Sequence, residues 1–308
     1  MHVPVIDLAG RDVASQIDSA CRDIGFFAVV GHDVARDVVN KAWDVATEFF
    51  DLPLDEKLGV RTEGVAYPYG YFPMDQESLG DGAPPDLNES FNLGPPEWSV
   101  AADGFVAHPR RWPNRPLSFQ SAWLAYYDAM ADLASRLMRW FAVGLELEAQ
   151  FFESSIDRHT AALRALNYPA QPVPPQPGQI RAAPHTDYGT LTILRPGEAT
   201  GGLEVRAAAG QWLTVPTVPD GFIVNIGDMM QMWTNDRWRS TVHRVVNPHA
   251  DFAAVERRQS IAFFHQPNWD TVIECLPSCT DDDHPPLHPP TTAGEWLQSR
   301  VEATHGHD

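Results

Sequence analysis

Apolar residues recur at helical spacing in three stretches of the chain. Residues 13–21 and 38–50 repeat apolar side chains three and four positions apart, which predicts amphipathic helices. Between them, residues 25–30 form a continuous apolar run that predicts a buried strand. A longer helix is predicted from Leu117 to about Leu145. Large side chains mark one face of it, as expected for packing against a core: Phe119, Trp123, Tyr126, Met130, Leu133, Leu137 and Phe141.

The second half of the chain has a different pattern, in which short apolar and β-branched runs follow one another closely. The predicted strands are residues 191–194, 203–206, 212–215, 222–226, 241–246 and 260–264. Turn-forming residues separate several of them, as in Pro219-Asp220-Gly221. Short strands at this spacing are typical of a jelly-roll sandwich. We therefore expect a mainly β fold with flanking helices.

The stretch from Tyr67 to Pro96 fits neither pattern. It is rich in Gly, Pro and Asp, and it carries the aromatic residues Tyr69, Tyr71 and Phe91. Its composition is too irregular for a core element, and long loops of this kind are commonly lids or binding loops. We expect a lid loop here.

Composition agrees with a cytoplasmic protein that can bury a large core, in either one domain or two. The chain has 308 residues, of which 44% are hydrophobic. No segment approaches the roughly 18 consecutive apolar residues of a membrane helix, and residues 1–7 lack the features of a signal peptide. Because an odd count of three cysteines is unlike a disulfide framework, we expect no disulfides.

The net charge of the chain excludes some classes of binding partner. The chain has 22 basic and 41 acidic residues, so its formal net charge is −19. Such a charge opposes binding to polyanions, which argues against nucleic acid or an anionic membrane as the partner. A small-molecule partner is expected instead.

Candidate metal ligands occur at His185 and Asp187, and again, after fifty-five intervening residues, at His243. Residues two apart on an extended strand project to the same side, so His185 and Asp187 can face one interior. His243 lies in a separate β-branched run that also reads as a strand. Two imidazoles and one carboxylate leave metal positions open, the arrangement associated with Fe(II) oxygenases.

A candidate anion anchor follows on the last predicted strand. Arg258 and Ser260 lie two residues apart and would share a face of that strand. A guanidinium fork with a nearby hydroxyl can hold a carboxylate by paired hydrogen bonds. Arg257 directly precedes Arg258, so the choice of Arg258 over Arg257 rests on the Arg-x-Ser pattern. Adjacent arginines could instead belong to a solvated charged face.

A rival metal site is formally available near the C-terminus. Cys275, Cys279, His284 and His288 are residue types found in structural zinc sites. Their spacing is loose, and the prolines at 285–286 and 289–290 favour an extended segment that would separate the histidines. The sequence therefore favours the His-x-Asp site over this one.

The chain resembles the isopenicillin N synthase-like branch of the Fe(II)/2-oxoglutarate-dependent oxygenases over nearly its whole length. The resemblance rests on residues 3–8, 21–27, 49–53, 184–194 and 224–245. It implies a double-stranded β-helix as the jelly-roll core. It also implies that His185, Asp187 and His243 bind iron, that Arg258 and Ser260 hold the distal carboxylate of 2-oxoglutarate, and that Tyr168 contacts this cosubstrate.

The same resemblance suggests a division of the chain and a place for the substrate. Residues 1–100 would form an N-terminal α/β region with the lid loop, 101–160 scaffold helices, 161–270 the jelly-roll core and 271–308 a C-terminal extension. The lid would lie near the mouth of the barrel. We expect Tyr69, Tyr71 and Phe91 to pack against a small molecule there, with Phe264 lining the pocket from the last strand.

The function implied is oxidation of a C–H bond of a small molecule by Fe(II), 2-oxoglutarate and O2. Hydroxylation, desaturation and cyclisation all remain open, and secondary metabolism is the expected setting. Two alternatives are also open. The chain could be an oxidase of the isopenicillin N synthase type, which uses O2 without 2-oxoglutarate, or a non-catalytic β-roll that binds a small molecule.

Overall fold

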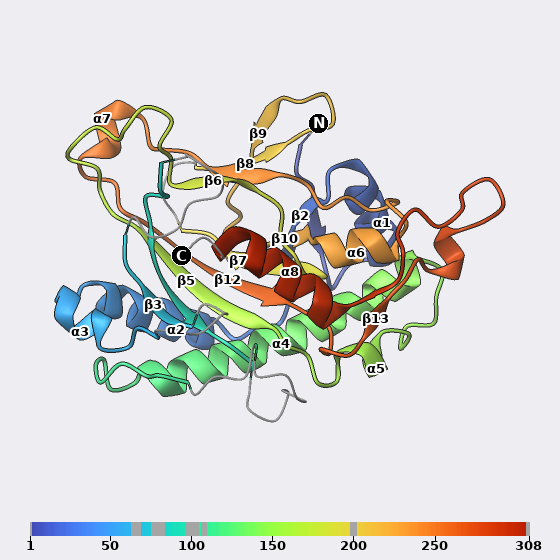
Figure 1. Ribbon diagram of the computed structural model, residues 1–308, viewed down its shortest axis with the longest axis horizontal. Helices are drawn as coiled ribbons and strands as arrows, with labels where there is room; N and C mark the ends of the chain where they lie inside the picture. The colour runs from blue at the N-terminus through green and yellow to red at the C-terminus, as the bar shows by residue number, and fades with distance from the viewer. Residues whose placement is uncertain are drawn as a thin grey trace.

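Two sheets face each other in the computed structural model, which describes residues 2–62, 69–74, 84–95, 105, 110–197 and 202–305 (Figure 1). The larger sheet has eight strands in the order β1 (Val5–Asp7), β2 (Phe26–Val30), β10 (Phe222–Ile226), β7 (Leu191–Arg195), β12 (Arg258–His265), β5 (Ala162–Tyr168), β4 (Glu89–Leu93) and β3 (Gly70–Phe72). The smaller sheet has four strands in the order β6 (Ala182–His185), β11 (His243–Val245), β8 (Leu203–Arg206) and β9 (Trp212–Thr214).

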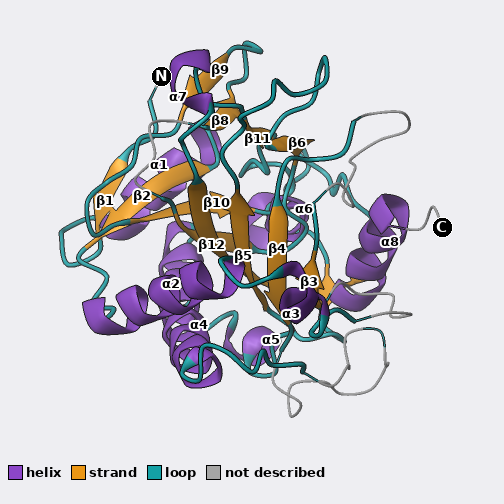
Figure 2. Ribbon diagram, turned by 90° about the vertical axis from the view of Figure 1, so that its left-hand side faces the viewer, coloured by secondary structure: helices purple, strands orange, loops and turns teal. Residues whose placement is uncertain are grey.

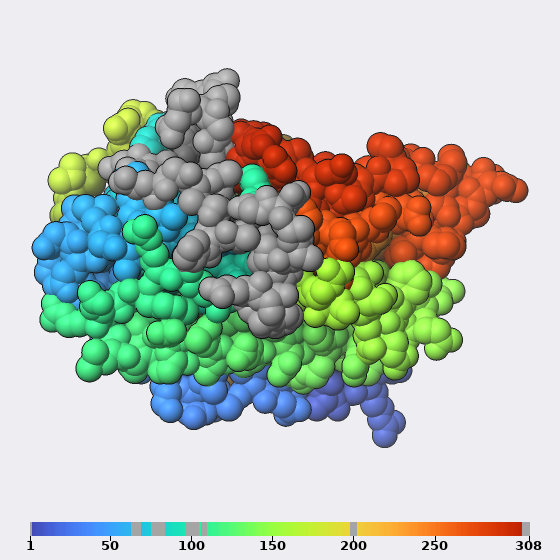
Figure 3. Space-filling model, turned by 60° about the horizontal axis from the view of Figure 1, so that its bottom comes forward, coloured from blue at the N-terminus to red at the C-terminus, as the bar shows by residue number. Residues whose placement is uncertain are grey.

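Three long helices cover the outer face of the larger sheet: α1 (Val13–Asp23), α2 (Arg36–Phe50) and α4 (Phe119–Gly144) (Figures 1 and 2). The green surface of α4 runs across this side of the molecule in the space-filling view (Figure 3). Short elements complete the description: α3 (Leu54–Leu58), α5 (Glu153–Ile156), α6 (Asp228–Trp233), α7 (Ala250–Ala253), β13 (Val272–Ile273), a 3-10 turn (Pro277–Cys279), β14 (Thr291–Thr292) and α8 (Ala293–His305).

The two faces of the larger sheet belong to two separate cores, because successive side chains of a strand point to opposite sides. On β12, Ile261 and Phe263 pack into the core beneath α4. On β5, Leu166 and Tyr168 point the other way, into the core between the sheets. Apolar residues of the smaller sheet close this inner core: Ala182, Leu203, Val205 and Val245. The space between the sheets is therefore the interior of the jelly roll.

The predicted elements are confirmed in their main lines. The three predicted helices are α1, α2 and α4, and the six strands predicted after residue 190 are β7 to β12. The predicted mainly β fold with flanking helices is therefore present. Strand β5 was not predicted, because Ala162–Tyr168 has no β-branched residue and reads as well as a helix. Its place between β12 and β4 decides its conformation.

The expectation that the stretch from Tyr67 to Pro96 contains no core element is wrong. Strands β3 and β4 both come from this stretch and form one edge of the larger sheet. The side chain of Phe91 packs on Phe49 of α2 and Phe119 of α4, with ring centroids 5.2 and 5.0 Å away. The remaining parts of this stretch, residues 67–68, 75–83 and 96, lie outside the described residues.

Tyr69 and Tyr71 are also buried in the core on the helical side. The hydroxyl of Tyr71 donates a hydrogen bond of 2.5 Å to Glu89, which also accepts from Lys57 and Asn167, both at 2.7 Å. This network satisfies a buried carboxylate, which would otherwise be costly to bury. Tyr71 and Phe91 therefore stabilise the sheet edge, and their side chains do not line the interior of the jelly roll as expected.

No described helix is long and apolar enough to cross a membrane.

Phe91→Ala should lower the free energy of unfolding by about 3–5 kcal/mol, because it leaves a cavity among buried rings. Phe252→Ala is the matched control, since Phe252 lies on α7 with 54% of its surface exposed, and its change should stay within about 0.5 kcal/mol. Urea denaturation followed by circular dichroism measures both. Equal effects of the two substitutions would contradict the placement of Phe91 in the core.

Candidate metal centre

His185 and His243 lie directly opposite each other on two paired strands of the smaller sheet. His185 ends β6 and His243 begins β11, and the two residues are register partners. Partners on neighbouring strands project to the same face, and their ring centroids are 4.3 Å apart. Asp187 follows β6 by two residues, and its Oδ1 is 4.0 Å from Nε2 of His185 and 3.8 Å from Nε2 of His243.

Backbone contacts orient both imidazoles. Nδ1 of His185 lies 2.7 Å from the carbonyl oxygen of Ala183, and Nδ1 of His243 lies 3.1 Å from that of Thr241. A carbonyl only accepts, so each Nδ1 carries the proton and donates it there. Each Nε2 is then left with a lone pair, and these lone pairs lie beside Asp187. Such support of the far ring nitrogen is usual for metal-binding histidines.

The carboxylate of Asp187 is supported by the larger sheet. Its Oδ2 accepts hydrogen bonds from Oγ1 of Thr192 on β7, at 2.5 Å, and from Nδ2 of Asn225 on β10, at 2.6 Å. Burial alone would raise the pKa of Asp187, but the two histidines and these two hydrogen bonds outweigh it and lower the pKa. Burial, with the neighbouring His243, lowers the pKa of His185. These shifts favour an ionised Asp187 carboxylate beside a neutral His185 imidazole.

These three residues form the one group of potential metal ligands that converges in the described parts of the chain, with ligand atoms within 4.8 Å of one another. The donor set fits Fe(II), since two imidazole nitrogens and one carboxylate leave positions for a cosubstrate and O2. The alternative zinc ligands Cys275, Cys279, His284 and His288 do not form such a group among the described residues. His284 contacts Asp281, His288 contacts Asp236, and the thiol of Cys275 contacts the backbone of Met232.

Arg258 and Ser260 share the inner face of β12, as predicted from their spacing. Arg258 is 3% exposed, and its Nη1 donates to Oγ of Ser260 at 3.4 Å. Tyr168 is its register partner on β5, and the guanidinium carbon lies 4.9 Å from the centroid of that ring. Arg257 faces the helical side instead, where it forms an ion pair with Asp51. The strand register thus separates the two arginines that the sequence left as alternatives.

Arg181 is a neighbour of this anchor that the sequence pattern did not reveal. It is 1% exposed, and its guanidinium carbon lies 5.9 Å from the ring centroid of Tyr168. Burial, together with the positive charge of Arg258, lowers its pKa. Its position four residues before His185 was the available indication, because residues four apart on an extended chain share a face. Nη2 of Arg181 donates to the backbone oxygen of Glu256 at 2.7 Å, and the Glu256 charge counters part of the Arg181 charge. The two buried guanidiniums around one tyrosine still favour an anion.

Phe264 occupies the inner face of β12, two rungs beyond Ser260, and is partly buried. Its register partner on β7 is Thr192, the residue that supports Asp187. Phe264 therefore shares a rung of the sheet with Thr192 and Asn225, the two residues that support the carboxylate of Asp187. This location is compatible with the predicted role in lining a pocket.

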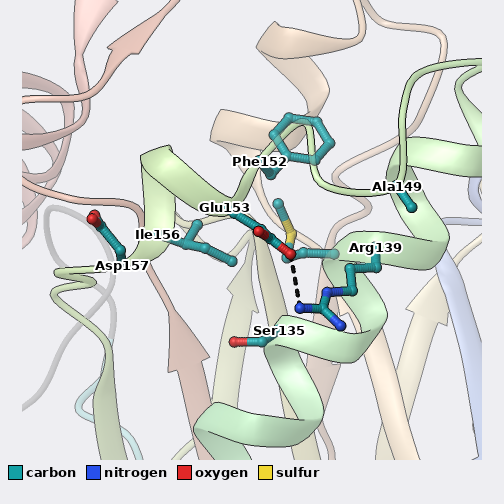
Figure 4. A pocket seen from close by; sticks show the side chains of 8 residues that line it. Ser135, Arg139, Ala149, Phe152, Glu153, Ile156 and Asp157 are labelled. Atoms are coloured by element: carbon teal, nitrogen blue, oxygen red, sulfur yellow. Dashed lines mark ion pairs between the residues drawn. The ribbon is translucent and has the colours of Figure 1, made fainter.

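A surface hollow between α4 and α5 has no part in this arrangement. Figure 4 shows it crossed by an ion pair between Arg139 and Glu153, 2.7 Å apart. Both side chains are about half exposed, and none of the residues lining the hollow lies on a strand that carries the candidate ligands. Exposed ion pairs of this kind are common and contribute little to the free energy of folding.

Comparison with known proteins gives the family. Residues 3–115 match the profile described as "non-haem dioxygenase in morphine synthesis N-terminal", and residues 160–267 match the "2OG-Fe(II) oxygenase superfamily". A 2-oxoglutarate-Fe(II) type oxidoreductase of Emericella nidulans is 31% identical, covering 98% of this chain and 90% of the relative. A homoarginine-6-hydroxylase of Arabidopsis thaliana is 33% identical over 89% of this chain and 82% of its own length.

Solved structures agree. A full-length Neurospora crassa protein, crystallised in complex with alpha-KG and thymine, superimposes with a TM-score of 0.87 at 30% identity, covering 98% of this chain and 97% of that one. The chain belongs to the isopenicillin N synthase-like Fe(II)/2-oxoglutarate-dependent oxygenases and has their jelly-roll core. It is a dioxygenase whose cofactors are Fe(II) and 2-oxoglutarate, with O2 as cosubstrate. The predicted family, fold and cofactors are therefore confirmed.

Asn225→Ala should weaken the binding of Fe(II) or Mn(II) to the metal-free protein by about 10- to 100-fold, because Asp187 loses a supporting hydrogen bond. Asn247→Ala is the control, since Asn247 donates to the backbone oxygen of Gln179 and does not touch Asp187. Anaerobic calorimetric titration measures both affinities. Unchanged affinity in Asn225→Ala would show that the support of Asp187 is immaterial to metal binding.

Proposed function

We propose that His185, Asp187 and His243 hold Fe(II), and that Arg258 and Ser260, with Tyr168 beside them, bind the distal carboxylate of 2-oxoglutarate. The observation that carries the second assignment is the environment of Arg258. This guanidinium is buried, and none of the described residues forms an ion pair with it through a carboxylate. A buried charge without a counter-ion is costly, so an anionic ligand is the natural partner.

The reaction we propose is hydroxylation of a C–H bond in a small organic molecule of secondary metabolism. One oxygen atom of O2 enters the product, and the other enters succinate as 2-oxoglutarate loses CO2. Hydroxylation is favoured over desaturation or cyclisation by the activity for which the Arabidopsis relative is named, that of a hydroxylase. When bound, the iron supplies the oxidising chemistry. The protein positions the reactants, and Phe264 is proposed to line the substrate pocket and exclude water.

The decisive experiment is an anaerobic titration of the Fe(II)-loaded protein with 2-oxoglutarate, followed by its absorption spectrum. Chelation of the metal by the keto acid should produce a charge-transfer band. An oxidase that uses O2 alone would show no such band, and neither would a non-catalytic β-roll. Succinate release that depends on an added small molecule would then establish coupled turnover.

Asp187→Ala should abolish turnover and weaken binding of Fe(II) severely, because the site loses its only negatively charged ligand. The fold should persist, since Asp187 lies outside the strands. Iron content, succinate formation and circular dichroism are the measurements. An Asp187→Ala protein with stoichiometric iron and full activity would overturn the assignment of the triad.

Arg258→Gln should raise the KM for 2-oxoglutarate about 10- to 100-fold, because a charge-assisted hydrogen bond to the carboxylate is worth roughly 1.5–3 kcal/mol. Arg257→Gln is the matched control, since Arg257 pairs with Asp51 on the opposite face of the sheet. Its KM should change less than about threefold. The reverse order of effects would mean that Arg257, and not Arg258, holds the cosubstrate.

A further inference from the structure

The inner face of the larger sheet continues past the cosubstrate anchor as a row of polar residues. Ser260 on β12 pairs with Leu166 on β5, which pairs with Ser90 on β4. On the next inward-facing rung, Ala262 pairs with Arg164, which pairs with Asn92. Strands β12, β5 and β4 lie side by side (Figure 2). Ser90, Asn92 and Arg164 therefore share the face that carries Arg258 and Ser260.

Asn92 has a buried side chain whose polar atoms accept and donate no hydrogen bond within the described parts of the chain. The residue is 5% exposed, and neither Oδ1 nor Nδ2 has a hydrogen-bond partner among the described residues. Buried polar groups are nearly always paired, and each exception calls for an explanation. Asn167 on the neighbouring strand provides the contrast. It faces the helical side, and its Nδ2 donates to Glu89 at 2.7 Å.

Arg164 stands beside Asn92 as its register partner on β5. Its Nη2 donates to Oγ of Ser90 at 3.0 Å, which fixes the guanidinium along this row. Ser90 is fully buried, so this hydrogen bond is made away from solvent. The row therefore combines the hydrogen-bond donors of Arg164 with the donor Nδ2 and the acceptor Oδ1 of the Asn92 side chain.

The row lies within reach of the candidate metal ligands. Phe264 pairs with Thr192 on one side and with Ala162 on the other, and Arg164 follows Ala162 by two residues. Strands are spaced about 4.8 Å apart, so the backbone of Arg164 is roughly 10–12 Å from that of Thr192, which supports Asp187. A small molecule bridging this distance would touch both the polar row and the metal centre.

We propose that Asn92 and Arg164 recognise the substrate, and that the substrate carries a planar amide-type group in which a carbonyl lies next to an N–H. Such a group accepts from Arg164 and from Nδ2 of Asn92, and its N–H donates to Oδ1 of Asn92. A carboxylate would leave Oδ1 without a donor. Ser90 acts as a positioning residue for Arg164. This inference rests on the proposed function, because it places the substrate beside that metal centre.

The test compares three planar rings. Uracil presents a ring amide, benzoate presents a carboxylate, and toluene presents no polar group. Each is titrated into protein loaded with Mn(II) and 2-oxoglutarate, so that no turnover occurs, and binding is followed by ligand-observed NMR. Uracil should bind at least tenfold more tightly than the other two. A preference for benzoate or toluene, or no detectable binding of uracil, would overturn the proposal.

Asn92→Leu should weaken the binding of uracil by about 10- to 100-fold, because the ligand loses both hydrogen bonds to the amide. The melting temperature of the ligand-free variant should stay the same or rise, since no protein hydrogen bond is lost. Asn167→Leu is the matched control and should lower the melting temperature, because Glu89 loses a donor. A lower melting temperature in Asn92→Leu with unchanged binding would show that Asn92 has a structural role.

Ser90→Ala provides a second variant that leaves Asn92 intact. It should weaken the binding of uracil severalfold, since Arg164 loses the contact that orients it. Unchanged binding would remove Ser90 from the proposal.

The charge-transfer band of Fe(II) and 2-oxoglutarate distinguishes a failure of the proposed function from a failure of the substrate proposal. If wild-type protein lacks the band, the proposed function fails. If the band is present and uracil binding does not depend on Asn92, this inference alone fails.

Discussion

The alternation of side chains along the strands of the larger sheet is the constraint on which both stability and chemistry depend. On β12, Ile261 and Phe263 pack under α4, while Arg258 and Ser260 face the interior of the jelly roll. A shift of one residue in strand register would exchange these two sets, placing a guanidinium in the apolar core. Packing against the helices therefore fixes the register, and the register in turn positions the anion anchor.

The candidate metal centre depends on both sheets at once. The smaller sheet supplies the two histidines as register partners, whereas the larger sheet supports the carboxylate through Thr192 and Asn225. Facing sheets pack about 10 Å apart, so the carboxylate can reach donors of the larger sheet only from a residue that bridges this space. Asp187 does so. The geometry of the site is thus coupled to the packing of the whole interior.

The negative net charge of the chain does not apply to the interior of the jelly roll, where two arginines are buried. The chain carries a formal charge of −19, yet Arg181 and Arg258 are both buried around the ring of Tyr168. Local fields at buried sites are screened far less than fields at the surface. A negative net charge therefore does not oppose an anionic cosubstrate at the proposed site, because the nearby guanidiniums are buried.

Local patterns in the sequence determined the main elements, the candidate metal ligands of the His-x-Asp motif and His243, and the candidate Arg-x-Ser anchor. Helical and strand periodicities are properties of neighbouring residues, so the sequence alone can show them. Tertiary structure alone decided which face each strand turned to the helices. The sequence pattern predicted that Tyr71 and Phe91 belong to a lid. In the structure, β4 pairs with β5, and both side chains point toward α2 and α4. Arg181 and Asn92 were missed for the same reason. Their burial depends on strands far away in the chain. The position of Arg181 four residues before His185 indicates a shared face, but it does not show that burial.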